Sequence, residues 1–250
     1  MVRPEMTKPR IHVTSDVISH DPDSIQLDKW QSNYLMNVLR LRKGDPVTVF
    51  DGEGGEYGAV LFETEEKKAA LRIVTRSKAG KNGHVEITCA VAIPKGKKMP
   101  LAVQKLTEIG VARIVPVVTK RTVVEVKERG AKKDRWTKIA VEAAKQCGRT
   151  VLPEIAEPVA LQTFFEACDG GALKLVAHEK TSRSLKEVLE RGQAPASVIF
   201  LIGPEGGLEA SEVKAAEAAG FLPFSFGRTI LRCETAAIAA AAILSYEFGS

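Results

Sequence analysis

The chain has 250 residues, of which 44% are hydrophobic and 27% charged, as expected for a soluble globular protein of one or two domains. No run approaches the roughly 18–20 apolar residues of a membrane-spanning helix, and no apolar segment of the signal-peptide kind follows the charged residues near the N-terminus. The net charge of +5 is uneven, because residues 76–150 carry 18 Lys and Arg against 6 Asp and Glu. A basic middle indicates a nucleic-acid surface, although lysines on ordinary solvated helices would give the same count.

Residues 10–75 have the pattern of a small β-rich domain. Short β-branched and aromatic runs predict strands at 46–50, 57–62 and 71–74, the first two joined as a hairpin by the glycine-containing turn 51–55. Several short strands at close spacing suggest a small barrel.

One helix is expected within this β-rich part, over residues 28–39. Its apolar spacing places Leu35, Val38 and Leu39 on one face.

A polar, glycine-containing stretch at 76–83 is the expected boundary between domains, which we place at residues 1–78 and 83–250. Beyond it, strands and helices alternate. Strands are expected at 85–93, 112–118, 173–177, 197–202 and 223–226. Helices are expected at 100–109 (ended by Gly110), 134–147, 161–168, 184–191, 209–219 and 234–248. The alternation predicts an α/β domain with a mostly parallel sheet.

The helix at 134–147 is strongly periodic. The residues expected on its inward face are Trp136, Ile139, Ala140, Ala143, Ala144 and Cys147. The final helix at 234–248 is rich in alanine, which permits close approach of another helix or a second subunit; high helix propensity alone would also explain it.

The cysteines and histidines show neither metal-ligand nor redox spacing. They are Cys89, Cys147, Cys168 and Cys233, and His12, His20, His84 and His178. We expect reduced, mostly buried thiols in a cytoplasmic protein, and no metal site.

Three loops are expected to meet at the carboxyl end of the parallel sheet, where α/β proteins bind ligands. The first is the glycine-rich segment 203–207, which follows the strand 197–202 and fits neither the G-x-G-x-x-G nor the P-loop pattern. The second is 227–236, before the last helix, and the third is 177–179. Together they predict one pocket for a nucleotide-like ligand.

This set of loops, in this order, resembles the SPOUT superfamily of S-adenosylmethionine-dependent RNA methyltransferases, and more narrowly the bacterial 16S ribosomal RNA uracil-N3 methyltransferase family. The matching motifs are LRLRKGD at 39–45, FDG at 50–52, KLTEIGV at 105–111, RW at 135–136, EAAKQCGR at 142–149, GPEGG at 203–207 and ILRCETA at 230–236. The chain departs from the family at Asn33-Tyr34, where a His-His pair is common, and at Cys233, where threonine is common.

The resemblance implies a PUA-like β-barrel RNA-binding domain followed by an α/β SPOUT domain with a deep C-terminal trefoil knot. It also implies S-adenosylmethionine as cofactor, a homodimer formed through the knotted domain, and 16S ribosomal RNA as substrate, within the 30S subunit.

Methyl transfer to uracil N3 must deal with the N3 proton, because the neutral imide is a poor nucleophile. A cation could stabilise the developing imidate, and Arg232 is our first candidate for it. Glu205 and Glu234 are alternative contacts for the cofactor's ammonium group or acceptors for the proton. Structural roles are equally open to them: Glu205 could accept backbone bonds in its loop, and Glu234 could cap its helix.

The cofactor is expected to be held largely by backbone groups of the three loops, with apolar packing against its adenine. The candidate residues are His178, Glu179, Leu201, Ile202, Gly203, Pro204, Glu205, Gly206, Gly207, Phe226, Gly227, Ile230, Leu231, Arg232, Glu234 and Thr235.

Basic residues are expected to position the RNA through its phosphates, and Gln146 and Arg149 could instead touch the target nucleotide, which must be unstacked for its N3 to react. The candidates are Arg10, Arg40, Arg42, Lys95, Lys97, Lys98, Lys120, Arg121, Lys132, Lys133, Gln146 and Arg149.

Two other functions remain open. One is a SPOUT enzyme for another RNA or for ribose 2′-O; the other is an RNA-binding ribosome assembly factor without catalysis. The sequence leaves open the position of the target uridine, the identity of any general base, and whether free RNA or the assembled subunit is the substrate.

Overall fold

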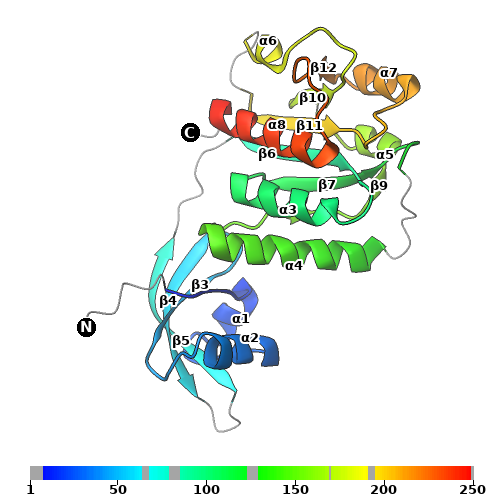
Figure 1. Ribbon diagram of the computed structural model, residues 1–250. Helices are drawn as coiled ribbons and strands as arrows, with labels where there is room; N and C mark the ends of the chain where they lie inside the picture. Colours follow the sequence, from blue (N-terminus) through cyan, green and yellow to red (C-terminus); the bar gives the residue numbers. More distant parts are fainter. Residues whose placement is uncertain are drawn as a thin grey trace. The chain divides into compact units, whose positions relative to one another are not determined.

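The computed structural model describes residues 8–63, 68–78, 85–122, 129–168, 170–190 and 195–248 (Figure 1). Residues 1–7, and residues 79–83 of the expected linker, lie outside this range. The chain divides into two compact units, one of residues 1–82 with 144–152 and the other of 83–143 with 153–250.

The N-terminal unit contains a five-stranded sheet in the order β1-β3-β4-β5-β2. Its strands are β1 (Arg10–His12), β2 (Ile25–Gln26), β3 (Pro46–Phe50), β4 (Gly55–Glu63) and β5 (Ala69–Lys78). The three predicted strands are therefore confirmed. Only β1 and β3 pair in parallel, and the order does not join β1 to β2, so the described strands do not show the pairing that would close the predicted barrel.

The helix expected at 28–39 is present, but it is built from α2 (Lys29–Asn33) followed by a π-helical turn, η1 (Tyr34–Val38). A π turn needs more residues than an α turn, so it moves later side chains off the predicted face. Leu35 is fully buried whereas Val38 is 61% exposed, so the prediction that they share one face was wrong.

The expectation of a single helix here was also wrong. The short helix α1 (Ser15–His20) buries only Ile18, and one apolar contact in six residues produces no detectable period.

Residues 144–152 return to complete the N-terminal unit. The backbone N–H of Leu152 donates to the carbonyl of Gly52 (2.8 Å), and that of Gly54 donates to Thr150 (3.2 Å). The guanidinium of Arg10 donates to the carbonyl of Gly148 (3.2 Å). The sequence contained no sign of this returning segment.

The second unit contains a parallel sheet in the order β12-β10-β11-β6-β7-β8, with β9 also paired to β7, which confirms the predicted α/β architecture. Its strands are β6 (Glu86–Ala92), β7 (Arg113–Val118), β8 (Glu154–Ile155), β9 (Val159–Ala160), β10 (Leu173–Ala177), β11 (Ser197–Ile202) and β12 (Leu222–Phe224). Only the two-residue strands β8 and β9 were not predicted.

Helices cover both faces of this sheet, and Figure 1 shows α3 and α8 side by side on one of them. The helices are α3 (Lys98–Ile109), α4 (Arg129–Cys147), α5 (Leu161–Glu166), α6 (Leu185–Leu189), α7 (Ala210–Ala218) and α8 (Cys233–Phe248). One core cluster joins the sheet to α3 and α8, and a second joins it to α5 and α7. None of the described helices is long and apolar enough to cross a membrane.

The predictions for the helix ends and the cysteines were confirmed to different degrees. Gly110 ends α3 in the left-handed conformation (φ 108°), as expected. Cys147, predicted to face inward on α4, is exposed, because it lies in the last turn before Gly148 ends the helix (φ 84°). Cys89 and Cys233 are buried and Cys168 is half-buried.

Candidate functional site

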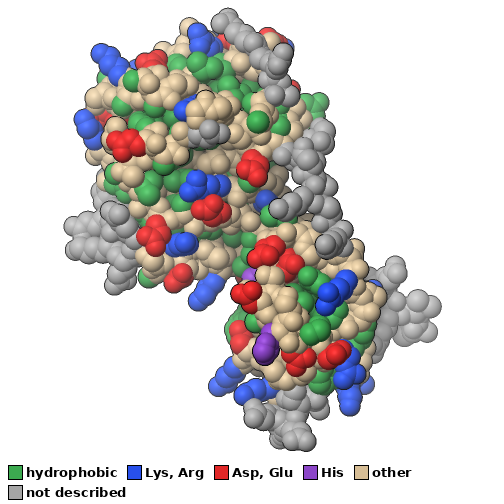
Figure 2. Space-filling model, turned by 180° about the vertical axis from the view of Figure 1, so that it is seen from behind, with side chains coloured by type: hydrophobic (Ala, Val, Ile, Leu, Met, Phe, Trp, Pro, Cys, Tyr) green, Lys and Arg blue, Asp and Glu red, His purple; other side chains and the backbone are tan. Residues whose placement is uncertain are grey.

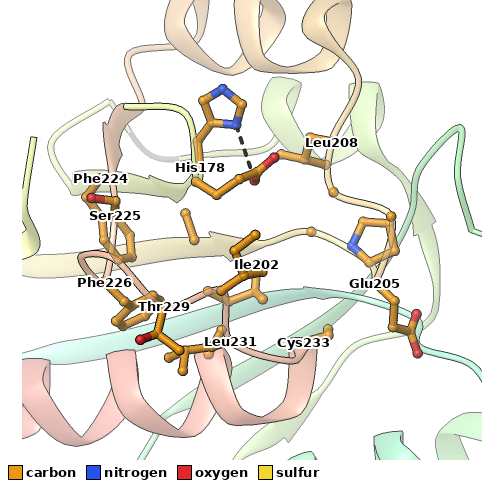
Figure 3. Close-up of a pocket in the computed structure, with 18 of the residues that line it drawn as sticks. His178, Ile202, Glu205, Leu208, Phe224, Ser225, Phe226, Thr229, Leu231 and Cys233 are labelled. Carbon is orange, nitrogen blue, oxygen red and sulfur yellow. Dashed lines mark ion pairs between the residues drawn. The ribbon is translucent and has the colours of Figure 1, made fainter. Parts of the chain in front are cut away.

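A cavity of about 200 Å³, partly open to solvent, lies where the loops after β10, β11 and β12 meet (Figure 3). Parallel strands present their carboxyl ends at one edge of the sheet, so loops far apart in sequence converge there. The cavity is lined by Ala177, His178, Glu179, Ile202, Gly203, Pro204, Glu205, Gly206, Gly207, Leu208, Phe224, Ser225, Phe226, Gly227, Thr229, Ile230, Leu231, Cys233 and Ala236.

The loop after β11 is a tight turn in which the backbone N–H of Gly207 donates to the carbonyl of Pro204 (2.8 Å). A Cβ atom at Gly203 would lie 3.1 Å from Cγ and 3.3 Å from the backbone nitrogen of Leu208. Gly207 has a φ of 70°, which side-chain-bearing residues rarely adopt. These glycines therefore let the backbone turn closely against the cavity.

Glu205 is part of the cavity lining, but its carboxylate is engaged in holding this loop. Its Oε1 accepts bonds from Nζ of Lys98 (2.7 Å) and the backbone N–H of Lys95 (3.2 Å), and Figure 3 shows the carboxylate turned away from the other loops. Partial burial acts to raise the pKa of Glu205, but the hydrogen bonds from Lys98 and from backbone groups outweigh it and hold that pKa below its ordinary value. The geometry favours the structural role that was left open for Glu205.

Two residues of the segment after β7 hold this loop and the helix α7 that follows it. The guanidinium of Arg121 donates to the carbonyl of Gly206. The backbone N–H of Lys120 donates to Oε1 of the buried Glu212 (2.8 Å), while Oε2 of Glu212 accepts from the backbone N–H of Glu209 (2.9 Å) and so caps α7.

The loop after β10 contributes His178 and Glu179. The backbone N–H of His178 donates to the carbonyl of Phe224 (2.8 Å), which joins this loop to the one after β12. Nδ1 of His178 is buried without a hydrogen-bond partner among the described residues; Oε2 of Glu179 is 3.8 Å away. The Glu179 carboxylate lies beside Gly207, at 3.6–3.7 Å from the position of a Cβ atom there. His178 and Glu179 thus add an imidazole and a carboxylate to the lining of the cavity.

The loop at 227–232 and the start of α8 form the remaining wall. Ile230 lines the cavity although it is 79% exposed. The thiol of Cys233 donates to the carbonyl of Ala92 (3.6 Å), and burial, with the nearby charges of Glu205 and Glu234, raises the pKa of this thiol to about 12. Cys233 is therefore a neutral wall residue at physiological pH.

Four predicted cofactor residues lie outside the cavity lining. Leu201 is fully buried beneath it, Arg232 and Thr235 are exposed, and Glu234 is buried with Oε2 unpartnered among the described residues. The carbonyl of Arg232 accepts the backbone N–H of Ala236 (2.8 Å) and so begins α8.

The other twelve predicted cofactor residues do line the cavity. The lining residues that were missed are Ala177, Leu208, Phe224, Ser225, Thr229, Cys233 and Ala236. All lie within or next to the predicted loops, so widening each loop to its flanking residues would have found them.

Several RNA candidates already have partners in the described structure. Arg10 forms an ion pair with Glu56 and lies over the ring of Phe50, so it acts inside its own unit. Lys98 pairs with Glu205, and Lys120 and Arg121 lie 3.4 and 3.8 Å from the carboxylate of Glu209.

The other RNA candidates differ in exposure. Lys132, Lys133 and Arg149 are half-buried, and burial lowers the pKa of the Arg149 guanidinium. Arg40 has a φ of 56°, a conformation uncommon for a residue other than glycine. The exposed candidates are Arg40, Arg42, Lys95, Lys97 and Gln146. On the face seen in Figure 2, basic and acidic side chains are interspersed rather than gathered in one basic patch.

No group of three or more His, Cys, Asp or Glu residues in the described part of the chain could hold a metal ion. The expected absence of a metal remains a prediction.

Comparisons with known proteins extend over nearly the whole chain. A family model described as an RNA methyltransferase domain matches residues 81–245, and one described as an RNA methyltransferase PUA domain matches residues 27–74. A ribosomal RNA small subunit methyltransferase E of Synechocystis is 35% identical over 85% of this chain and 70% of its own length. Its namesake in Bacillus subtilis is 27% identical over 95% of both chains.

Two solved structures are similar over 97% of this chain and 98% of their own. A methyltransferase of Legionella pneumophila with bound S-adenosylmethionine is 31% identical, with a TM-score of 0.87. A ribosomal RNA small subunit methyltransferase E of Neisseria gonorrhoeae, bound to the same molecule, is 27% identical, with a TM-score of 0.84.

Proposed function

The chain belongs to the family of ribosomal RNA small subunit methyltransferase E, and from this premise we propose that it transfers a methyl group from S-adenosylmethionine to N3 of a uridine in 16S ribosomal RNA. The family expected from the sequence motifs is thereby confirmed. The observation that carries the proposal is the cavity formed by the three loops at the end of the parallel sheet.

The cavity has the groups that S-adenosylmethionine requires. Ile202, Leu208 and Leu231 offer apolar surface for an adenine ring, and the backbone of the glycine-rich loop is close enough to meet its polar edge. The carboxylate of Glu179 is a partner for the ammonium group, and the unpartnered Nδ1 of His178 is a partner for a hydroxyl or carboxylate. The residues fit the cofactor.

S-adenosylmethionine, when bound, supplies an electrophilic methyl group on a sulfonium centre. The protein's own task is to hold uracil N3 in line with that group and to stabilise the imidate formed as the N3 proton leaves. Arg232 is the cation proposed for this, because its exposed side chain directly precedes Cys233 of the cavity wall. Oε1 of Glu205 is engaged by Lys98 and by the backbone N–H of Lys95, so Glu234, with its unpartnered Oε2, is the carboxylate proposed to accept the proton.

Replacing Arg232 by alanine tests its proposed role. We expect R232A to lower kcat for methylation of 16S RNA by roughly 10²–10³-fold, the usual effect of removing one charge-stabilising group, with the Kd for S-adenosylmethionine unchanged. R228A is the matched control, because Arg228 is an exposed arginine of the same loop. Full activity in R232A would show that the assignment is wrong.

Analysis of the modified nucleoside tests the target atom. We expect 3-methyluridine from 16S RNA; a ribose-methylated nucleoside, or modification of a different RNA, would replace the substrate proposed here. If calorimetry shows no binding of S-adenosylmethionine, a non-catalytic RNA-binding assembly factor becomes the better hypothesis for the function.

The quaternary and cellular context is also proposed. We expect a homodimer formed through the face of α8 that carries Ile243 and Tyr246; the Tyr246 side chain is 82% exposed in the single chain. We also expect a trefoil knot in the C-terminal segments. A monomeric Y246E variant in light scattering, beside a dimeric wild type, would support this interface. The same proposal includes three further expectations. The chain divides into domains 1–78 and 83–250, the protein is cytoplasmic, and the 30S particle is its preferred substrate. Methylation rates on free RNA and on 30S particles distinguish the two substrates.

A further inference from the structure

The two tryptophans of the chain have opposite environments. Trp136 is 5% exposed and packs in the core beside α3 and α8, whereas Trp30, on α2, is 55% exposed. Leaving an indole in water forgoes the stabilisation that its burial would bring. Other residues anchor α2 and η1: Leu35 of η1 is fully buried, and Oγ of Ser32 in α2 accepts the backbone N–H of Ala69 (3.2 Å).

The exposed indole is part of an ordered assembly of side chains. Its ring is stacked on that of Tyr34, with centroids 5.5 Å apart and parallel planes. Nζ of Lys145, from the segment that completes the N-terminal unit, lies 5.0 Å from the centroid of the Trp30 ring and 4.8 Å from that of Tyr34. Two aromatic rings and an ammonium group are thus held together, with the largest ring facing solvent.

Polar groups lie next to these rings. Asn33 and Asn37 follow Trp30 by three and seven residues on the same short helical segment, are exposed, and are joined by a hydrogen bond of 2.8 Å. Amide side chains both donate and accept hydrogen bonds, as the edge of a nucleobase requires.

We propose that Trp30, Tyr34 and Lys145 form a stacking platform for an unpaired base of the RNA substrate, a site separate from the methyl-transfer cavity. Aromatic rings interleaved with cations are the usual surface for single-stranded nucleic acid, because every base has a face that can stack and every nucleotide carries a phosphate. Trp30 and Tyr34 lie in the segment matched by the RNA methyltransferase PUA model. The inference rests on RNA being the substrate, as proposed above.

Affinity for a short oligouridylate tests the platform in the full-length protein. We expect W30A to bind it roughly 5- to 150-fold more weakly than wild type, the range for losing one base–aromatic stack, and W30F to retain most of the affinity. V74A is the matched control, because Val74 is an apolar residue of the same unit with 57% of its surface exposed. Equal affinity in W30A, V74A and wild type would overturn the proposal.

Tryptophan fluorescence provides a readout that a purely structural role would not change. Stacking should quench the Trp30 signal saturably in wild type, and W30F, which keeps only the buried Trp136, should show no such change. Quenching by anionic phospholipid vesicles but not by RNA would also overturn the proposal.

The methylation assay separates this inference from the proposed function. If wild type methylates 16S RNA and W30A binds RNA unchanged, the platform alone is wrong. If wild type neither binds S-adenosylmethionine nor methylates RNA, the proposed function is wrong.

Discussion

The two main walls of the cavity are built in opposite ways. The loop at 203–208 is held by hydrogen bonds at residues 204–207: Glu205 to Lys98 and Lys95, Gly206 to Arg121, and Gly207 to Pro204. The loop ends at Leu208, whose side chain is buried.

The loop at 227–232 is held much more loosely. Its side chains make no hydrogen bond or ion pair with any described residue, and Arg228, Thr229, Ile230 and Arg232 are exposed. Its anchors lie at its two ends, where Phe226 packs edge-on against Phe224 (5.2 Å) and Cys233 enters the core.

The contrast shows how a site can combine affinity with access. A wall that is already ordered loses little conformational entropy when a ligand binds to it. A wall with exposed apolar side chains contributes binding free energy, because the ligand removes those side chains from water. Changes in the first wall should therefore affect folding, and changes in the second should affect ligand binding.

The largest effect is expected for Leu208→Ala. Leu208 packs with Val213 and Phe221, and truncating a buried leucine costs about 2–5 kcal/mol of unfolding free energy. Urea unfolding followed by circular dichroism measures the loss. A change in unfolding free energy below about 1 kcal/mol would mean that the loop at 203–208 contributes no more to stability than the loop at 227–232.

Ile230→Ala should have an intermediate effect of a different kind. Because Ile230 is largely exposed, the unfolding free energy should stay within about 0.5 kcal/mol of wild type. Calorimetry should show S-adenosylmethionine bound about three- to tenfold more weakly, since the cofactor loses an apolar surface to cover. Unchanged affinity would remove Ile230 from the site.

The smallest effect is expected for Glu205→Gln, and it depends on pH. The pKa of Glu205 is lower in the folded protein than the ordinary value of 4.5, so the charge stabilises the fold above about pH 4.5 and its contribution disappears as the pH falls through the folded value. E205Q should therefore be slightly less stable than wild type at pH 7, and the difference should vanish in acid. The pair is partly exposed, which keeps the effect small. Thermal unfolding of both proteins across this pH range measures it, and a gap that persists in acid would contradict the ion-pair explanation.

The fold could be predicted where side chains repeat with a clear period. In the second unit the sheet is buried on both faces, so its longer strands are continuous apolar runs, and each was predicted within a few residues. The N-terminal unit was predicted less completely, because α1 and the strands β1 and β2 have only two to six residues each, too few for a pattern. The π turn at 34–38 breaks the period on which the prediction for Val38 relied.

The site could be predicted to the level of loops but not of side chains. Glycine spacing helped to identify the loops that meet, because turns with positive φ angles or close backbone contacts usually require glycine. The direction of a charged side chain depends on partners distant in sequence, as with Glu205 and Lys98, or Arg10 and Glu56. Nothing near Trp30 in the sequence indicates Lys145, which lies 115 positions further along.

The return of residues 144–152 to the N-terminal unit has a consequence for biosynthesis. On the ribosome, domains generally fold as they emerge, N-terminal first. Here the first unit is incomplete until residues 144–152 have left the exit tunnel. By then β6, α3, β7 and α4 have already been synthesised. A nascent chain arrested before Gly148 should resist protease poorly, and one arrested well after Leu152 should resist it strongly. The two halves of the protein would then mature together rather than in turn.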